Sequence, residues 1–428
     1  MKVLISIIVG AIFYAILTPL SLASDIGKRF PSERRTFVDK VTGLTITALT
    51  TSPANDQLPY QTHPHWTSDG KYIVFHSDRA SDGSNQAFAL CDETGEIIQL
   101  TEGATRTNGL NVARKSNRLY FLRGAINGPK ELIELKLDPL LADSKAGTMK
   151  SPDAYQRVIM TMLENLKDSG GFVLDADETA AYIGVSFEGP AGPQKEAQQA
   201  TGAQKESLPT QTTRCYGIRG IDLTTGELKK IIDVPFRIGH VQVNPFVPGE
   251  ILYCHETGGD APQRMWIVKA DGTGDRPLYK ETPDEWVTHE VWIDKDHVMF
   301  NIMAHLPGLR EKPTGIAVIN VRNNEMRIVG QTNEVLGFWH CNGTSDGRWA
   351  VGDTFEGNIY LIDRHNYETM LLTTDHKMKP DHTHPFFSPD GKRILFQSGL
   401  LSNGKNLNLM TVEIPISWLN RQYTKGTP

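Results

Sequence analysis

Cysteine is scarce in this chain. Its 428 residues include four cysteines, Cys91, Cys215, Cys254 and Cys341, which lie far apart and show no CxxC spacing. Disulfide frameworks belong mainly to small secreted domains that are dense in cysteine. We therefore expect buried free thiols rather than a disulfide scaffold.

Clusters of lysine and arginine are also lacking, and the formal net charge of −6 argues against a nucleic-acid partner. The chain has neither a GxSxG nucleophile elbow nor a phosphate-binding glycine loop. Helix-forming runs are few, whereas short runs of Val, Ile, Tyr and Phe bounded by Gly, Asp and Asn turns are many. This pattern predicts an all-β protein.

The N-terminus has the pattern of a secretory signal peptide. Lys2 is followed by an apolar run and then by the small residues Ser21, Ala23 and Ser24. We expect cleavage after residues 1–23 and a periplasmic or secreted protein with no stable membrane association thereafter. An uncleaved membrane anchor is the alternative, and it also places the domain outside the cytoplasm.

A turn followed by an apolar strand recurs seven times. The copies are "SDGKYIVFHSD", "SNRLYFLRG", "DETAAYIGVSFEG", "PGEILYCHE", "KDHVMFNI", "SDGRWAVGD" and "SPDGKRILFQSG", beginning at Ser68, Ser116, Asp177, Pro248, Lys295, Ser345 and Ser388. Most are spaced by about the 40–50 residues of a four-stranded propeller blade. Strand-turn-strand segments such as "INVRNNEMRIVG" supply the outer hairpins. Residues 24–428 are therefore predicted to form one seven-bladed β-propeller domain.

Three segments depart from the repeat. Residues 189–212 are rich in Gln, Ala, Gly and Pro and predict a flexible insertion. In residues 151–171, Ile159, Met162, Leu163 and Leu166 have helical spacing, so we expect a short helical insertion there. Residues 26–50 are expected to supply an outer strand that closes the ring with the last blade.

Histidines recur on the predicted innermost strands, just before the turns. His63, His340 and His384 each lie six residues before a turn aspartate, and His382 and His240 lie eight residues before a turn. His289 lies about seven residues before its turn, so these segments hold six of the 13 histidines. A single histidine would more often be a structural, hydrogen-bonded one. Six that converge on one channel favour a functional site.

Imidazoles from separate strands suit Mn, Fe, Ni or Zn. His289, His382 and His384 are our candidate metal ligands, because the last two point the same way, roughly 6.5 Å apart along a strand. The "HPH" pair at His63 and His65 is more typical of a structural pattern.

The segments "IGHVQVNPF", "CHETGGDAPQRMWIVKADGTGDRPLY", "WVTHEVW" and "DHTHPFFSPDGKRILFQS" resemble the oligogalacturonate lyases of polysaccharide lyase family 22. The likeness covers most of the chain after about Thr213. It implies metal-assisted β-elimination on short uronate oligosaccharides, with a divalent cofactor, expected to be Mn²⁺, held by histidines and a glutamine.

Carried over by motif, the resemblance makes His240 the catalytic base, His289, His382 and His384 the metal ligands, and Arg214 or Arg219 the active-site arginine. Lys379 stands where the family has its metal-binding glutamine. An ammonium group does not readily bind a metal, so either Asp381, another residue or water substitutes, or the ion is lost. We assign His63, His340 and Lys379 to substrate binding.

Two alternatives are a non-catalytic TolB-like propeller that binds a protein or glycan, and an enzyme that acts on another acidic glycan. The sequence does not indicate the oligomeric state.

Overall fold

The computed structural model of the chain describes residues 24–103, 107–124, 128–190, 212–259, 261–282, 285–303 and 314–421. The expected leader and nearly all of the low-complexity insertion lie outside these ranges. Within them, no helix has both the length and the apolar character needed to cross a membrane.

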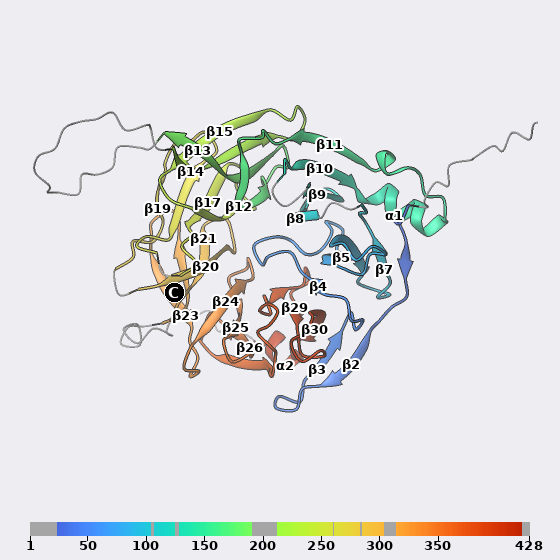
Figure 1. Cartoon of the computed structure of the whole chain (residues 1–428). Coiled ribbons are helices and arrows are strands. Elements are labelled where there is room, and N and C mark those ends of the chain that lie inside the picture. Colours follow the sequence, from blue (N-terminus) through green and yellow to red (C-terminus); the bar gives the residue numbers. More distant parts are fainter. Residues whose placement is uncertain are drawn as a thin grey trace, which may run out of the picture.

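The described residues form seven antiparallel sheets arranged in a ring, which confirms the predicted propeller (Figure 1). Blade one has β4 (Asp56–Gln57), β5 (Tyr72–Ser77), β6 (Gln86–Cys91) and β7 (Ile97–Gln99), with β1 (Arg29–Phe30) at its outer edge. Blade two has β8 (Thr107–Val112), β9 (Arg118–Arg123), β10 (Glu131–Lys136) and β11 (Gln156–Thr161). Blade three has β12 (Lys167–Leu174), β13 (Ala180–Pro190), β14 (Thr212–Asp222) and β15 (Leu228–Val234).

Blade four has β16 (Ile238–Val243), β17 (Glu250–His255), β18 (Met265–Lys269) and β19 (Arg276–Pro277). Blade five has β20 (Val287–Trp292), β21 (His297–Ile302), β22 (Gly315–Asn320) and β23 (Met326–Gly330). Blade six has β24 (Phe338–Gly343), β25 (Trp349–Thr354), β26 (Ile359–Asp363) and β27 (Thr369–Thr373). Blade seven has β28 (Phe386–Phe387), β29 (Arg393–Ser398) and β30 (Asn408–Glu413), followed by the short helix α2 (Ile416–Leu419).

The N-terminal segment closes the ring. β3 (Thr45–Ala48) pairs with β30, and β2 (Arg35–Val38) pairs with β3, so two early strands complete the last blade. The sequence predicted this closure with one strand. Ile46 and Ala48 are fully buried in the core of that blade, so the closure buries apolar side chains as well as pairing strand edges.

The recurring Asp-Gly turns have a common hydrogen-bonding pattern. Asp69, Asp346 and Asp390 each accept hydrogen bonds from a hydroxyl two residues earlier and from the backbone N–H two residues later. The glycine after each aspartate has a positive φ, which glycine adopts without steric cost. This pattern begins the second strand of each of these blades.

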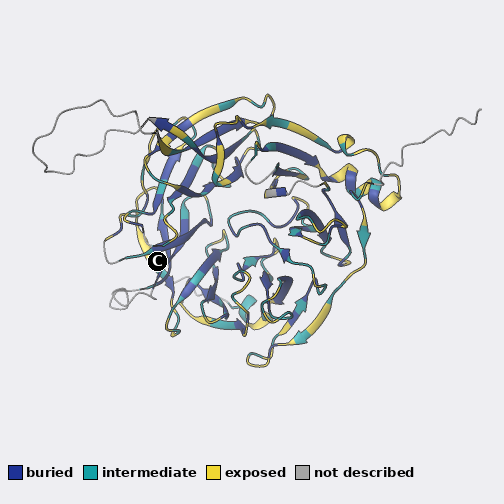
Figure 2. Ribbon diagram, in the orientation of Figure 1, coloured by how far each residue is buried: buried dark blue, intermediate teal, exposed yellow. Residues whose placement is uncertain are grey.

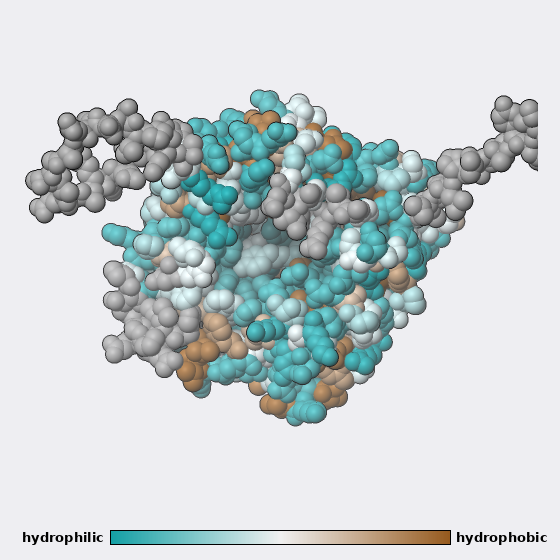
Figure 3. All heavy atoms as spheres, viewed as in Figure 1, coloured by the Kyte–Doolittle hydropathy of each residue, from teal (hydrophilic) through white to brown (hydrophobic). Residues whose placement is uncertain are grey.

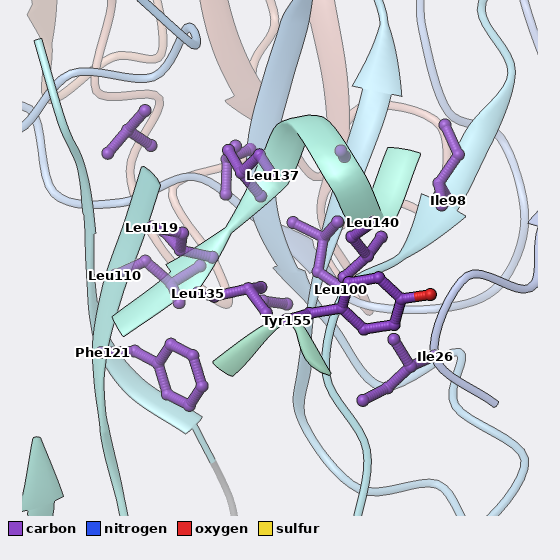
Figure 4. Close-up of a cluster of buried hydrophobic side chains, with 14 of the residues drawn as sticks. Ile26, Ile98, Leu100, Leu110, Leu119, Phe121, Leu135, Leu137, Leu140 and Tyr155 are labelled. Atoms are coloured by element: carbon purple, nitrogen blue, oxygen red, sulfur yellow. The ribbon is translucent and has the colours of Figure 1, made fainter. Parts of the chain in front are cut away.

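The apolar core lies between the blades. Figure 2 shows buried strands within the ring and exposed residues along its rim. One cluster joins blades one and two through Ile98, Leu119 and Phe121, and Leu140 of helix α1 (Leu137–Ala146) completes it (Figure 4).

The prediction of a helix within residues 151–171 is wrong. That segment contains a 3-10 turn (Pro152–Ala154), then β11, then the start of β12. The helical spacing arose because Met162 and Leu166 are buried in the turn between two blades, while Leu163 is 56% exposed. The helix lies just upstream, as α1, and it explains the long gap between the second and third repeats.

All four cysteines are free, as expected. Cys254 and Cys341 are buried, whereas Cys91 and Cys215 are partly exposed.

Candidate active site

The first strands of neighbouring blades lie side by side around the channel, and the face seen in Figure 3 is hollowed at its centre. The strands β8, β12, β16, β20 and β24 each have a register shift against the next strand of their blade. Within these shifts, His240 and His289 have φ values of 46° and 55°, and His384, just before β28, has 45°. Positive φ in a non-glycine residue costs about 1–3 kcal/mol and clusters at functional sites.

Four histidines of blades five to seven form a compact cluster. The ring centre of His340 lies 4.2 Å from that of His289, 4.0 Å from that of His384 and 5.2 Å from that of His382. Tyr60, on the loop after β4 that reaches the middle of the ring (Figure 1), contacts His340 and His384. The structure therefore brings all three predicted metal ligands together, with His340 among them.

The three predicted ligands have unused nitrogen atoms. Within the described part of the chain, the Nδ1 atoms of His289, His382 and His384 are buried and have no hydrogen-bond partner. Burial, and then the neighbouring His340, lower the pKa of His289 well below its usual value, so its ring stays neutral. Neutral imidazoles with free lone pairs are what a divalent transition metal requires.

Asp381 orients one of these rings. Its Oδ2 lies 3.3 Å from Nε2 of His384 and also accepts hydrogen bonds from Gln57 and Gln397. Burial alone would raise the pKa of Asp381, but the hydrogen bond from His384 lowers it to about 2. A carboxylate on one ring nitrogen leaves the other directed at a metal, as is usual around metal-binding histidines.

His240 has a different environment. Its Nδ1 lies 3.0 Å from Oε1 of Glu290, and Oε2 of Glu290 lies 3.1 Å from Nε of Arg264. Glu290 is fully buried and Arg264 is 3% exposed. Burial would raise the pKa of Glu290, but Arg264 and then His240 lower it far below its usual value. An ionised Glu290 beside Nδ1 favours the tautomer of His240 that carries its hydrogen on Nδ1, which places the lone pair on Nε2.

His240 lines a cavity of about 290 Å³ together with His63, Tyr60 and Glu256, among others. Nε2 of His240 lies 3.9 Å from Oε2 of Glu256. Gly170 and Gly171 form part of the cavity wall, and a side chain at Gly170 would come within 2.5 Å of a backbone carbonyl. Glycine is therefore required where the backbone closes in on the cavity.

A second cavity of about 450 Å³ adjoins the first, and Arg237 lines both. Lys167 and Arg214 line the second cavity and are exposed. Three basic side chains against one acidic residue, Asp168, line the second cavity, so it can attract anionic groups.

The other predicted site residues are placed as follows. Arg219 is buried between β14 and β15, where it donates to the carbonyl of Ile232 and pairs with Asp233 at 2.8 Å, so it does not face the channel. His63 lines the cavity, and its Nε2 donates to the carbonyl of Phe172. Lys379 is exposed.

Sequence reasoning missed Glu290, Arg264, Glu256 and Tyr60. Glu290 directly follows His289 in "VTHEVW", and in a regular strand the two side chains would point to opposite faces. The register shift in β20 lets both reach the site. His240, Cys254 and Glu290 also group metal-binding atom types, but Arg264 already neutralises Glu290 there.

Two solved structures share this architecture. An oligogalacturonate lyase in complex with manganese superposes with a TM-score of 0.74 at 22% identity, covering 92% of this chain and 100% of that one. An oligogalacturonate lyase from Vibrio parahaemolyticus gives 0.73 at 22% identity with the same coverage. At this identity the likeness establishes the class of fold, a seven-bladed propeller shared with these lyases.

The family is established by the sequence. The family described as oligogalacturonate lyase matches residues 24–356. The oligogalacturonate lyase of Dickeya dadantii is 23% identical over 395 residues, covering 87% of this chain and 94% of the relative. This chain belongs to the oligogalacturonate lyase family, which confirms the resemblance seen in the motifs.

Proposed function

We propose that this protein cleaves short oligogalacturonates by β-elimination, with His240 as the base. The observation that carries this proposal is the setting of His240, whose Nδ1 meets an ionised carboxylate while the residue lines a cavity beside the histidine cluster. The family and the curated relative support the substrate class.

In the proposed reaction, Nε2 of His240 takes the proton from C5 of the uronate. The electrons of the C5–H bond form the C4–C5 double bond as the C4–O bond to the leaving sugar breaks. Burial raises the pKa of Tyr60 well above its usual value, so its hydroxyl stays protonated. Tyr60 lines the same cavity and can return a proton to the departing oxygen.

His289, His382 and His384 would hold a divalent ion, and manganese is the ion named for the similar solved lyase. When bound, the ion supplies positive charge that neutralises the C6 carboxylate and stabilises the enolate-like intermediate. The buried Nδ1 atoms of the three rings, which have no hydrogen-bond partner, fit this role.

Lys167, Arg214 and Arg237 would bind carboxylates of the neighbouring sugars. An arginine side chain grips a carboxylate through two parallel N–H groups, and it remains charged at any working pH. This arrangement favours an acidic oligosaccharide over a neutral one.

The test is to incubate the purified protein with galacturonate and glucuronate oligomers, with Mn²⁺ or with a chelator. The unsaturated product absorbs in the near ultraviolet because its new double bond is conjugated with the carboxylate. We expect His240→Ala to lower kcat at least about 10²-fold. His297→Ala, at the start of β21 and paired with Asp294, is the control and should retain activity. No absorbance with any uronate overturns the lyase proposal, and activity that survives His240→Ala overturns the choice of base.

We also propose that the protein meets its substrate outside the cytoplasm, on the strength of Lys2 and the apolar run that follows it. N-terminal sequencing of the mature protein from a periplasmic or secreted fraction is the test. An intact Met1 in a cytoplasmic fraction would contradict it.

A further inference from the structure

We infer that His340 is a fourth imidazole ligand of the divalent ion and supplies the ligand that Lys379 cannot. This inference rests on the proposed metal-assisted function. His340 comes from β24 in blade six, between the blade that carries His289 and the blade that carries His382 and His384.

The first argument is position. Of the four rings, His340 is the one that contacts each of the others, at centre-to-centre distances of 4.0 to 5.2 Å. Ligand-type atoms of His340, His382 and Asp353 lie within 4.8 Å of one another. An ion held by His289, His382 and His384 would therefore lie near the ring of His340.

The second argument is the orientation of the ring. Nδ1 of His340 lies 3.2 Å from both carboxylate oxygens of Asp353, which is fully buried. Asp353 also accepts hydrogen bonds from the backbone N–H of His340 and from the N–H and hydroxyl of Thr383. Its oxygens are thus occupied, so Asp353 fixes the imidazole rather than binding the ion. Donation from Nδ1–H leaves Nε2 with the lone pair that a metal needs.

The third argument is accessibility. His340 is 2% exposed, and it is not among the residues that line the cavity beside His240. A substrate sugar in that cavity would meet Tyr60 and His63 instead. The exposed Lys379 offers a cation where a ligand would be needed. His340 is therefore better placed to bind an ion than to bind the sugar, which was its role predicted from the sequence.

The experiment measures binding of Mn²⁺ alone to the full chain after chelator treatment, by metal analysis and by the loss of the free-ion EPR signal. His340→Ala should weaken Mn²⁺ binding about 10–100-fold or more. The control is His376→Gln, at a buried histidine whose nitrogens bond Ser398 and Thr373. It should bind Mn²⁺ within about twofold of the wild type. Unchanged Mn²⁺ affinity in a folded His340→Ala variant overturns the inference.

A second measurement needs no substitution. Pulsed EPR of the Mn²⁺-loaded wild type, with and without ¹⁵N-histidine, counts the coordinated imidazoles. Four coordinated imidazoles support the inference, and three overturn it. In the latter case a wild type that still forms unsaturated product keeps the proposed function intact. A wild type that neither binds Mn²⁺ nor forms product overturns both.

Discussion

The carboxylate of Asp353 binds Thr383, the residue that separates His382 from His384. Its Oδ2 accepts the Thr383 hydroxyl at 2.8 Å and the Thr383 N–H at 3.2 Å, and all of these atoms are buried. Because Asp353 belongs to β25 of blade six, these bonds fix the His382–His384 segment of blade seven against its neighbour.

Thr383→Val should therefore weaken both the fold and the metal site. Removing the hydroxyl leaves a buried carboxylate oxygen short of a donor, which costs about 1–3 kcal/mol of unfolding free energy. Mn²⁺ affinity should fall about tenfold. Urea denaturation and Mn²⁺ titration measure the two effects. Thr179→Val is the matched control, since Thr179 makes an equally short but exposed bond to Asp177. Equal losses in both variants would contradict the coupling.

Glu290→Gln should lower kcat rather than raise KM. A neutral amide in place of the carboxylate holds the His240 ring less firmly and stabilises the protonated ring less. We expect kcat to fall about 10²-fold with KM within about threefold. Arg264 loses its nearer counter-ion and keeps Glu256 at 3.7 Å, so steady-state rates are measured below the variant's unfolding temperature. Glu250→Gln, at a glutamate that pairs with Arg322, should leave kcat unchanged. A rise in KM alone would assign Glu290 to substrate binding.

Arg214 and Arg219, which the sequence could not separate, should respond differently to alanine. Arg219→Ala removes a buried guanidinium that donates to the carbonyl of Ile232 and pairs with Asp233. We therefore expect a loss of about 1–3 kcal/mol of unfolding free energy. The value of kcat/KM should stay within about threefold of the wild type. Arg214→Ala should raise KM about tenfold and leave thermal stability unchanged. A rise in KM for Arg219→Ala and a loss of stability for Arg214→Ala would show that Arg219 binds the substrate and Arg214 supports the fold.

Acid should destabilise the fold through buried histidines. Burial lowers the pKa of His65 to about 3 and that of His376 to about 4, against about 6.5 in the unfolded chain. Below about pH 6.5 the unfolded chain binds more protons than the native protein, so stability falls as the pH drops. Between pH 7 and pH 5 each histidine should account for about 2 kcal/mol. His376→Gln should reduce the difference between urea denaturation at the two pH values by that amount. An undiminished difference would contradict the assignment.

Ring closure should depend on the apolar face of β3. Ile46→Ala opens space in a fully buried position and should cost about 2–5 kcal/mol. Val38→Ala on the adjoining β2 is the control, because Val38 is 59% exposed. Chemical denaturation of both variants measures the difference. Equal stabilities would mean that the early strands contribute little to the last blade.

The sequence predicted the ring of blades because each second strand follows a turn with its own signature, such as Asp69-Gly70. It also predicted which histidines gather, since the channel strands precede those turns. It could not predict the local register shifts that turn His240 and His289 into the channel, because strict alternation assumes an unbroken strand. The role of Asp353 could not be predicted from the sequence for a related reason. Its contact with His340 depends on the pairing of two strands, which no short motif records.

The four clustered histidines come from three separate blades, and this has a mechanical consequence. Propeller blades touch mainly through side-chain packing and share no strand pairing, so an ion bound by these histidines would join three sheets that side-chain bonds such as Thr383–Asp353 already link. Loading would then add stability in proportion to the logarithm of ion concentration, about 2.7 kcal/mol at one hundred times Kd. Loading would therefore hold blades five and six more firmly to blade seven, where the N-terminal and C-terminal strands of the chain meet.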